Sequence, residues 1–282
     1  MTPNDVKWIQ IEASSKCNAW CPMCSRNKNG YGLRDNLVEE DVPTEKVQQA
    51  IEKLPNLEMI EFCGNLGDPV IAKNFLELIA VAKTTRAKIR IHTNGSLRTE
   101  EWWTNLAKEL ANVEHDIWFG LDGLAGVHEI YRQGTSYQKI IDNATAFIQA
   151  GGTAVWQFIP YAHNEHQIKD CLKLSQRLGF KRFELVKGFR RDQQARHYRT
   201  GEPFALDPPT TIHRVMRMPK PNTYVDPNNC MHQYQSSVFM NSNGKLNYCC
   251  FFGRKGSVNN VEELLYNKVD LTRETCIKEC GS

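Results

Sequence analysis

The chain has 282 residues, of which 41% are hydrophobic, 10% aromatic and 24% charged, a composition that excludes an intrinsically disordered protein. Its 35 Lys and Arg residues against 32 Asp and Glu residues give a net charge of +3, which does not by itself indicate a nucleic-acid partner. The sequence contains no apolar run long enough to cross a bilayer, and its start does not resemble a secretory signal. We therefore expect a cytoplasmic protein without membrane association, built from one large domain and a small appendage.

Short apolar stretches alternate with helical patterns through the first two thirds of the chain. Repeated strand–helix units predict a parallel sheet with its helices packed outside. Six units fit either an open doubly wound sheet or a partial barrel, and periodicity does not choose between the two. The expected strands are Lys7–Ala13, Met59–Cys63, Lys88–His92, Asp116–Leu121, Thr153–Pro160 and Arg182–Val186. The expected helices are Thr44–Lys53, Lys73–Lys83, Glu100–Leu110, Tyr137–Ala150 and Glu165–Leu178.

Local residues mark several helix ends. Thr44 is expected to cap the first helix, with Gln48 nearby. Gly151-Gly152 and Gly179 are expected to end the two later helices, because glycine readily adopts the backbone conformation found after a helix.

The pattern changes after the last expected strand. Six prolines between Lys187 and Asn229 break up long elements, so this part of the chain is predicted to be a bridge with one helix near Thr211–Met218. Beyond the bridge, Ser236–Met240 and Lys245–Cys250 are expected to form a hairpin, followed by a helical stretch at Val261–Tyr266.

The sequence has ten cysteines, at positions 17, 21, 24, 63, 171, 230, 249, 250, 276 and 280. Three gather near the N-terminus and five lie close to the C-terminus, on either side of the strand–helix units. In a reducing compartment, cysteines grouped in this way more often bind metal than form disulfides.

The first group, Cys17, Cys21 and Cys24, has C-x3-C-x2-C spacing directly after the first expected strand. Close thiolates on one loop suit a soft metal or an iron–sulfur cluster. Three thiolates would hold a cubane cluster while leaving one iron open to another ligand. A zinc site is the alternative, for which His92 could supply a fourth ligand.

These cysteines and the motifs after the next three strands resemble the radical S-adenosylmethionine (radical SAM) superfamily. The resemblance covers roughly residues 7–190 and implies a partial (β/α)6 barrel. The motifs are Leu66-Gly67-Asp68-Pro69, which is similar to the family's GGEP with Asp in place of Glu, then Thr93-Asn94-Gly95, Leu121-Asp122-Gly123, His128 and Arg132-Gln133-Gly134.

The resemblance implies a role for each of these residues. Cys17, Cys21 and Cys24 would hold a [4Fe-4S] cluster whose open iron binds the amino and carboxylate groups of S-adenosylmethionine (SAM). Asp68 would accept a hydrogen bond from the SAM ammonium group, and Arg132 would pair with the carboxylate. The candidates for ribose or methionine contacts are Asn94, Asp122 and Gln157. Turn formation at strand ends is the alternative role of Asn94 and Asp122.

The second cysteine group resembles the twitch domain, a shortened SPASM domain with one auxiliary [4Fe-4S] cluster. Its spacing is C-x13-G-x4-C followed by C-x3-C, which implies the ligands Cys230, Cys249, Cys276 and Cys280. Cys250 is the alternative to its neighbour Cys249, and a structural zinc site is the alternative to the cluster. The expected domains are thus a barrel at residues 1–190, a basic bridge at 191–229 and an auxiliary domain at 230–282.

Two cysteines belong to neither group. Cys171 lies in an expected helix and is predicted to be a small buried hydrophobic residue. Cys63 ends the second expected strand, beside the loop that carries Asp68. It is either part of the core or a hydrogen-atom donor that faces the active site.

The resemblance implies an enzyme that cleaves SAM reductively to a 5′-deoxyadenosyl radical, which removes a hydrogen atom from a substrate. A one-electron donor such as a flavodoxin or a ferredoxin would supply the electron. The leading substrate class is a ribosomally made peptide or a protein side chain. The sequence does not name the substrate, the bond formed or broken, the fate of SAM or the oligomeric state.

Two alternatives remain open. The first is a phosphate-bearing substrate such as a nucleotide, nucleoside or nucleic acid. It is suggested by ten Lys and Arg residues against four acidic residues between Lys181 and Lys220, with Phe183, Phe189, His197 and Tyr198 interleaved. A solvated basic surface would explain the same charges. The second is a non-enzymatic iron–sulfur electron carrier.

Overall fold

The computed structural model describes residues 2–27, 30–186, 194–210, 236–247 and 257–266. Six strands appear in the places expected from the sequence, and their ends differ from expectation by no more than two residues. They are β1 (Trp8–Glu12), β2 (Met59–Cys63), β3 (Lys88–Thr93), β4 (His115–Gly120), β5 (Ala154–Phe158) and β6 (Arg182–Leu185).

The six strands pair in parallel and in chain order, as β6-β5-β4-β3-β2-β1. A doubly wound sheet reverses its strand order near the middle and has helices on both faces, whereas this order has no reversal. Consecutive parallel neighbours are the arrangement of a barrel wall. The sheet does not close, so the prediction of a partial (β/α)6 barrel is confirmed.

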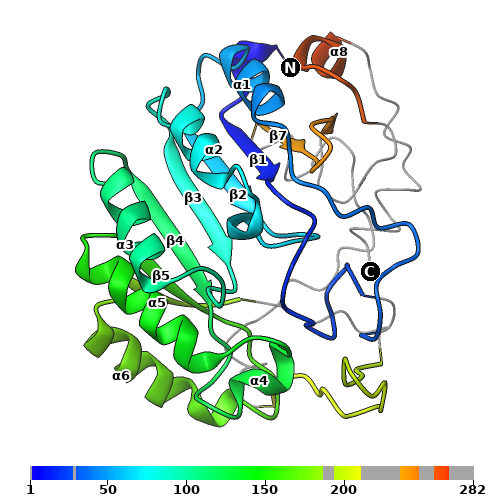
Figure 1. The fold of residues 1–282 in the computed structure, drawn as a ribbon, viewed down its shortest axis with the longest axis vertical. Helices are drawn as coiled ribbons and strands as arrows, with labels where there is room; N and C mark the ends of the chain where they lie inside the picture. The colour runs from blue at the N-terminus through cyan, green and yellow to red at the C-terminus, as the bar shows by residue number, and fades with distance from the viewer. Residues whose placement is uncertain (1, 28–29, 187–193, 211–235, 248–256, 267–282) are drawn as a thin grey trace.

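The helices that connect these strands cover one face of the sheet, as Figure 1 shows. We call this the outer face, and the opposite one the inner face. The connecting helices are α1 (Thr44–Glu52), α2 (Phe75–Ala82), α3 (Glu100–Glu109), α5 (Tyr137–Gln149) and α6 (Ile168–Leu178). A short α4 (His128–Tyr131) follows β4, and 3-10 turns occupy Pro3–Asp5, Pro69–Ile71 and Glu165–Gln167.

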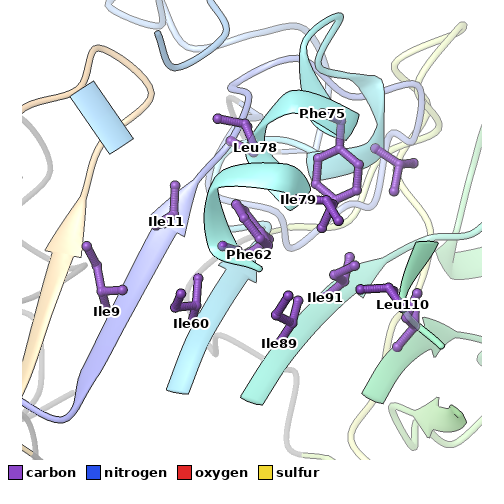
Figure 2. Close-up of a cluster of buried hydrophobic side chains, with 14 of the residues drawn as sticks. Ile9, Ile11, Ile60, Phe62, Phe75, Leu78, Ile79, Ile89, Ile91 and Leu110 are labelled. Atoms are coloured by element: carbon purple, nitrogen blue, oxygen red, sulfur yellow. The ribbon is translucent and has the colours of Figure 1, made fainter. Parts of the chain in front are cut away.

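The core lies between the outer face and these helices. Ile60 and Phe62 of β2 point to the same side as Ile89 and Ile91 of β3, toward α2 (Figure 2). All four side chains have no exposed surface. Because side chains alternate across a strand, the residues between them point to the inner face.

One predicted helix end is wrong. Pro43 occupies the N-cap of α1, and Thr44 is the first helical residue. The Thr44 hydroxyl donates to Glu77 at 3.1 Å, and its oxygen accepts from Asn74 Nδ2 at 2.8 Å, so it bonds to other side chains and does not cap the helix. The predicted end of α6 is confirmed, since Gly179 adopts a left-handed conformation with φ of 88° at the C-cap.

The hairpin after the bridge continues the sheet. β7 (Ser237–Met240) and β8 (Leu246–Asn247) are antiparallel, as expected, and α8 (Val261–Tyr266) follows them. β7 also pairs in parallel with β1, with Trp8 opposite Ser237. The domain boundary at residue 230 and the helix near Thr211–Met218 fall outside the described residues and stay predictions.

Among the described residues, no helix has both the length and the apolar character needed to span a membrane.

Candidate cluster and cofactor site

The three N-terminal cysteines share one loop, which leaves the carboxyl end of β1 and spans residues 13–27. We call it the cysteine loop. Backbone N–H groups point at two of the sulfurs, from Ala19 to Cys17 Sγ at 3.3 Å and from Arg26 to Cys24 Sγ at 3.5 Å. Cys21 is 8% exposed, and none of the three cysteines forms a disulfide. The thiols pack in a second apolar cluster, separate from the main core, with Ala19, Met23, Tyr131, Ile159, Tyr161, Ala195, Phe204 and Leu206.

Burial governs the acidity of these thiols. It raises the pKa of Cys17 and Cys24, and it raises the pKa of Cys21 to about 12. The Arg132 guanidinium acts in the opposite direction and lowers the pKa of Cys21. Thiolates in such a place need a positive partner, and iron supplies one because a metal ligand must lose its proton. The chemistry of this donor set therefore fits an iron–sulfur cluster.

The zinc alternative with His92 as fourth ligand is not formed. His92 binds Glu61 Oε1 through Nε2 at 2.7 Å and faces Gln157 Oε1 through Nδ1 at 3.3 Å, so both ring nitrogens are occupied. In the described parts of the chain, no three His, Cys, Asp or Glu side chains converge as the ligands of a single metal ion.

Asp122 and Arg132 form a buried ion pair beside Cys21. Arg132 Nε donates to Asp122 Oδ2 at 2.6 Å, while the Ile159 N–H donates to Asp122 Oδ1 at 2.6 Å. Asp122 has no exposed surface. Burial raises the pKa of Asp122, and Arg132 offsets part of that increase. A Cβ at Gly120 would lie 2.7 Å from the Arg132 guanidinium, so a larger residue there would have to displace the arginine from its present position at the end of β4.

Asp68 and Asn94 link the ends of β2 and β3 to the cysteine loop. Asp68 is 3% exposed, and its carboxylate accepts hydrogen bonds from Thr93 Oγ1, the Asn94 N–H and the Val70 N–H. Asn94 Nδ2 donates to Asn18 Oδ1 at 2.9 Å and lies 3.7 Å from Cys17 Sγ. Burial raises the pKa of Asp68, and the hydrogen bond from Asn94 is the largest opposing influence.

The loop before Asp68 is held by side chains from β1 and from the cysteine loop. Glu12 Oε1 accepts from the Leu66 and Gly67 N–H groups, both at 2.9 Å, and Glu12 Oε2 accepts from the Asn65 N–H at 3.1 Å. Arg26 donates to the carbonyls of Leu66 and Ser15. Burial raises the pKa of Glu12 to about 8, although the three N–H groups lower it.

A segment of the predicted bridge lies against the cysteine loop. Trp20 stacks on Tyr198 with ring centroids 6.0 Å apart. Gln133 binds the backbone of both residues, and its side-chain oxygen accepts from the Tyr198 N–H at 2.8 Å. The carbonyl of Gln133 accepts from the Trp20 N–H at 2.7 Å. Ala195, Phe204 and Leu206 of the same segment pack in the apolar cluster that contains the three cysteines.

The inner face of the sheet also carries polar side chains. Glu61, His92 and Gln157 form the hydrogen-bonded row described above. On the same face, Asp116 accepts from Lys88 at 3.0 Å, from Arg90 at 2.8 Å and from Arg182 at 3.2 Å. Both arginines lie over the Trp118 ring, at 5.0 and 5.6 Å from its centroid.

The structure brings together most of the residues selected from the sequence. Cys17, Cys21, Cys24, Asp68, Asn94, Asp122 and Arg132 meet at the carboxyl ends of β1 to β4. Gln157 faces His92 on the inner face, and Cys63 is buried at the end of β2, opposite Glu12 in the strand register. Cys230, Cys249, Cys276 and Cys280 lie outside the described residues. Glu12, Arg26 and Glu61 were not expected, since an isolated charged residue carries no motif.

A family model described as the radical SAM superfamily matches residues 11–175. The chain belongs to the radical SAM superfamily. Membership implies an enzyme that uses a [4Fe-4S] cluster and SAM.

One curated relative is a tungsten-containing aldehyde ferredoxin oxidoreductase cofactor-modifying protein from Pyrococcus furiosus. It is 30% identical over 130 residues, which are 46% of this chain and 34% of that protein. The match thus spans about a third of the length of this relative.

Solved structures share the fold over most of the chain. The structure of anSMEcpe with bound AdoMet has a TM-score of 0.65 at 14% identity, covering 98% of this chain and 80% of that one. Streptococcus suis SuiB bound to S-adenosylmethionine has a TM-score of 0.63 at 14% identity, covering 94% of this chain and 65% of that one. Methylornithine synthase (PylB) reaches 0.51 at 12% identity, over 68% of this chain and 56% of that one.

Proposed function

We propose that this radical SAM enzyme modifies a peptide or a protein side chain, and that Cys17, Cys21 and Cys24 hold its catalytic cluster. The observation that carries the assignment is the packing of the three cysteines, Cys21 buried and Cys17 and Cys24 partly buried, beside Asp68, Asn94 and the Asp122–Arg132 pair. When bound, the cluster supplies the electron that splits SAM into methionine and a 5′-deoxyadenosyl radical, which takes a hydrogen atom from the substrate.

The neighbouring side chains would bind and orient SAM. We assign the SAM ammonium group to Asp68 and the carboxylate to the guanidinium of Arg132, whose planar donors suit a carboxylate. Asp122 accepts from Arg132 and from the Ile159 N–H, so we assign it the additional role of holding Arg132 in place. Asn94, Asp122 and Gln157 are the proposed contacts to the rest of SAM.

A peptide substrate is supported by relatives and by the inner face. Structurally similar chains include anSMEcpe with Cp18Cys peptide, with a TM-score of 0.62, and SuiB bound to precursor peptide SuiA, with a TM-score of 0.61. On the inner face, Glu61 Oε2 and Trp118 Nε1 are buried without hydrogen-bond partners among the described residues. One acceptor and one donor in this place suit the N–H and C=O groups of a peptide bond.

A cofactor is the second candidate substrate, since the curated relative is named for cofactor modification. The phosphate-bearing alternative loses part of its support. Phe183 packs on Trp156 and Phe158, and Tyr198 stacks on Trp20, so part of the surface of each ring is already covered by another aromatic side chain. Arg190 and Arg191, the proposed anion contacts of the bridge, lie outside the described residues.

We further propose that Cys230, Cys249, Cys276 and Cys280 hold an auxiliary [4Fe-4S] cluster in a twitch-like domain, and that a flavodoxin or ferredoxin is the electron donor. Anaerobically reconstituted protein should then contain about eight irons per chain. Cys249→Ala should lose the auxiliary cluster and Cys250→Ala should keep it. The reverse result would assign the ligand to Cys250.

The substrate class can be tested with peptides encoded in small reading frames beside the gene. Protein, SAM and dithionite are incubated anaerobically with each peptide, and 5′-deoxyadenosine and peptide mass are measured. We expect one peptide to raise 5′-deoxyadenosine formation above the peptide-free level and to change mass. If the peptides have no effect and a cofactor precursor does, the second candidate replaces the first.

A further inference from the structure

The loop of residues 64–68, which we call the Asp68 loop, depends on side chains from elsewhere for its backbone hydrogen bonds. It lies between β2 and the 3-10 turn at Pro69–Ile71 and has no regular secondary structure of its own. Three consecutive N–H groups, those of Asn65, Leu66 and Gly67, all donate to the Glu12 carboxylate. Without that carboxylate, three backbone donors of this loop would lose their partner.

The carbonyls of the same loop are bound by the cysteine loop. Arg26 donates to the Leu66 carbonyl at 2.9 Å, and the Ser25 hydroxyl donates to the Asn65 carbonyl at 2.5 Å. The Asp68 N–H in turn donates to the Lys16 carbonyl at 2.8 Å. The two loops are therefore connected through both their donors and their acceptors.

The two charged residues of this connection are almost completely buried. Glu12 is 1% exposed and Arg26 is 2% exposed. Burial of charged side chains is unfavourable unless hydrogen bonds compensate it, and here every compensating bond of Glu12 that the structure gives goes to the Asp68 loop. Gly67 also packs against the Ser14 and Lys16 carbonyls so closely that a Cβ there would overlap them.

We propose that Glu12 and Arg26 are positioning residues that fix the Asp68 loop against the cysteine loop. They set the separation between the iron that the three cysteines leave open and the carboxylate that receives the SAM ammonium group. This inference rests on the proposed function, because it requires the Asp68 loop to bind SAM. It assigns no contact between either residue and SAM.

The two oxygens of Glu12 give the proposal a graded test. Oε1 serves Leu66 and Gly67, whereas Oε2 serves only Asn65. Glu12→Gln can keep the oxygen that serves two N–H groups, and Glu12→Ala removes all acceptors. Glu39→Gln is the matched control, since Glu39 accepts at 2.8 Å from Arg26 Nη2, whereas Nη1 serves the Leu66 carbonyl, and the Glu39 side chain is 46% exposed.

The experiment measures SAM binding to the reconstituted full chain without reductant, so that SAM is bound and not cleaved. Glu12→Ala should raise the Kd for SAM about tenfold or more at unchanged iron content, and amide hydrogen exchange at Asn65, Leu66 and Gly67 should speed up. Glu12→Gln should raise Kd by about threefold or less and speed up exchange chiefly at Asn65. Glu39→Gln should leave both readouts at their wild-type values.

Several outcomes would overturn the proposal. One is a Glu12→Ala protein that binds SAM with the wild-type Kd. Another is a variant that loses iron while its loaded fraction keeps the wild-type Kd, which would make Glu12 structural only. If Glu12→Ala does not fold, equal exchange at all three amides in Glu12→Gln contradicts the assignment of the two oxygens. A wild-type protein that carries the cluster but binds no SAM would instead remove the proposed function.

Discussion

The two faces of the sheet differ in what their side chains do. On the outer face, Ile89 and Ile91 alternate into a core shared with α2 (Figure 2). On the inner face of the same strand, Lys88, Arg90 and His92 form ion pairs and hydrogen bonds with β2 and β4. The outer face thus supplies the burial that stabilises the fold. The inner face carries polar and charged groups.

Ile91 of β3 tests this difference most strongly. Ile91→Ala removes a side chain with no exposed surface and should lower the free energy of unfolding by about 2–5 kcal/mol. Its folded fraction should still cleave SAM, because Ile91 points away from the site. Chemical denaturation and 5′-deoxyadenosine formation are the measurements. A stable variant, or a folded but inactive one, would contradict the assignment of the faces.

The ion pairs of Asp116 test whether the inner face also contributes stability. Its side chain is 2% exposed and binds three cations, so Asp116→Asn should cost about 2 kcal/mol in unfolding free energy. Glu184→Gln is the control, since Glu184 is 41% exposed and pairs only with Arg182 in the described parts of the chain. Equal effects of the two substitutions would show that Asp116 is no more than a surface charge.

The buried side chain of His128 makes the stability of the fold depend on pH. It has no exposed surface, its Nδ1 accepts from the Asp122 N–H at 3.1 Å, and burial lowers the pKa of His128 to about 3. Below pH 6.5 the unfolded chain therefore gains a proton that the folded chain does not, and stability falls by up to about 1.4 kcal/mol per pH unit.

His128→Gln lacks this contribution. Denaturation at pH 7.5 and at pH 5.5 should show that the stability difference between wild type and variant is smaller at the lower pH. A difference that does not change with pH would mean that the folded protein takes up the proton on His128.

Cys63 is expected to have the smallest effect on stability. Cys63→Ala should cost about 1 kcal/mol in unfolding free energy. If Cys63 donates a hydrogen atom to a substrate radical, the variant should still cleave SAM but fail to complete the product. A thiol hydrogen exchanges with solvent, so product formed in D2O by wild type should contain one deuterium if Cys63 donates to the substrate radical. Normal, unlabelled product would make Cys63 a core residue only.

Most of the outer face was predictable from the sequence, because apolar residues recur there with the periods of strands and helices. The site was predictable where residues form motifs, as for the three cysteines, Asp68 and Arg132. Glu12 and Arg26 were not predictable, since they bind backbone groups far along the chain. Leu66 is 40 residues from Arg26, and Asn65 is 53 residues from Glu12. The pairing of β7 with β1 was not predictable for the same reason, since Trp8 and Ser237 lie far apart in the sequence and meet only in the folded chain.

The central claim is that Cys17, Cys21 and Cys24 hold the cluster that cleaves SAM. The direct measurement is 5′-deoxyadenosine formation by the reconstituted protein with SAM and dithionite under anaerobic conditions. We expect wild type and Cys171→Ala to form it, and a variant with all three cysteines replaced by alanine to form none. Formation of 5′-deoxyadenosine by the triple variant at the wild-type rate would contradict the claim.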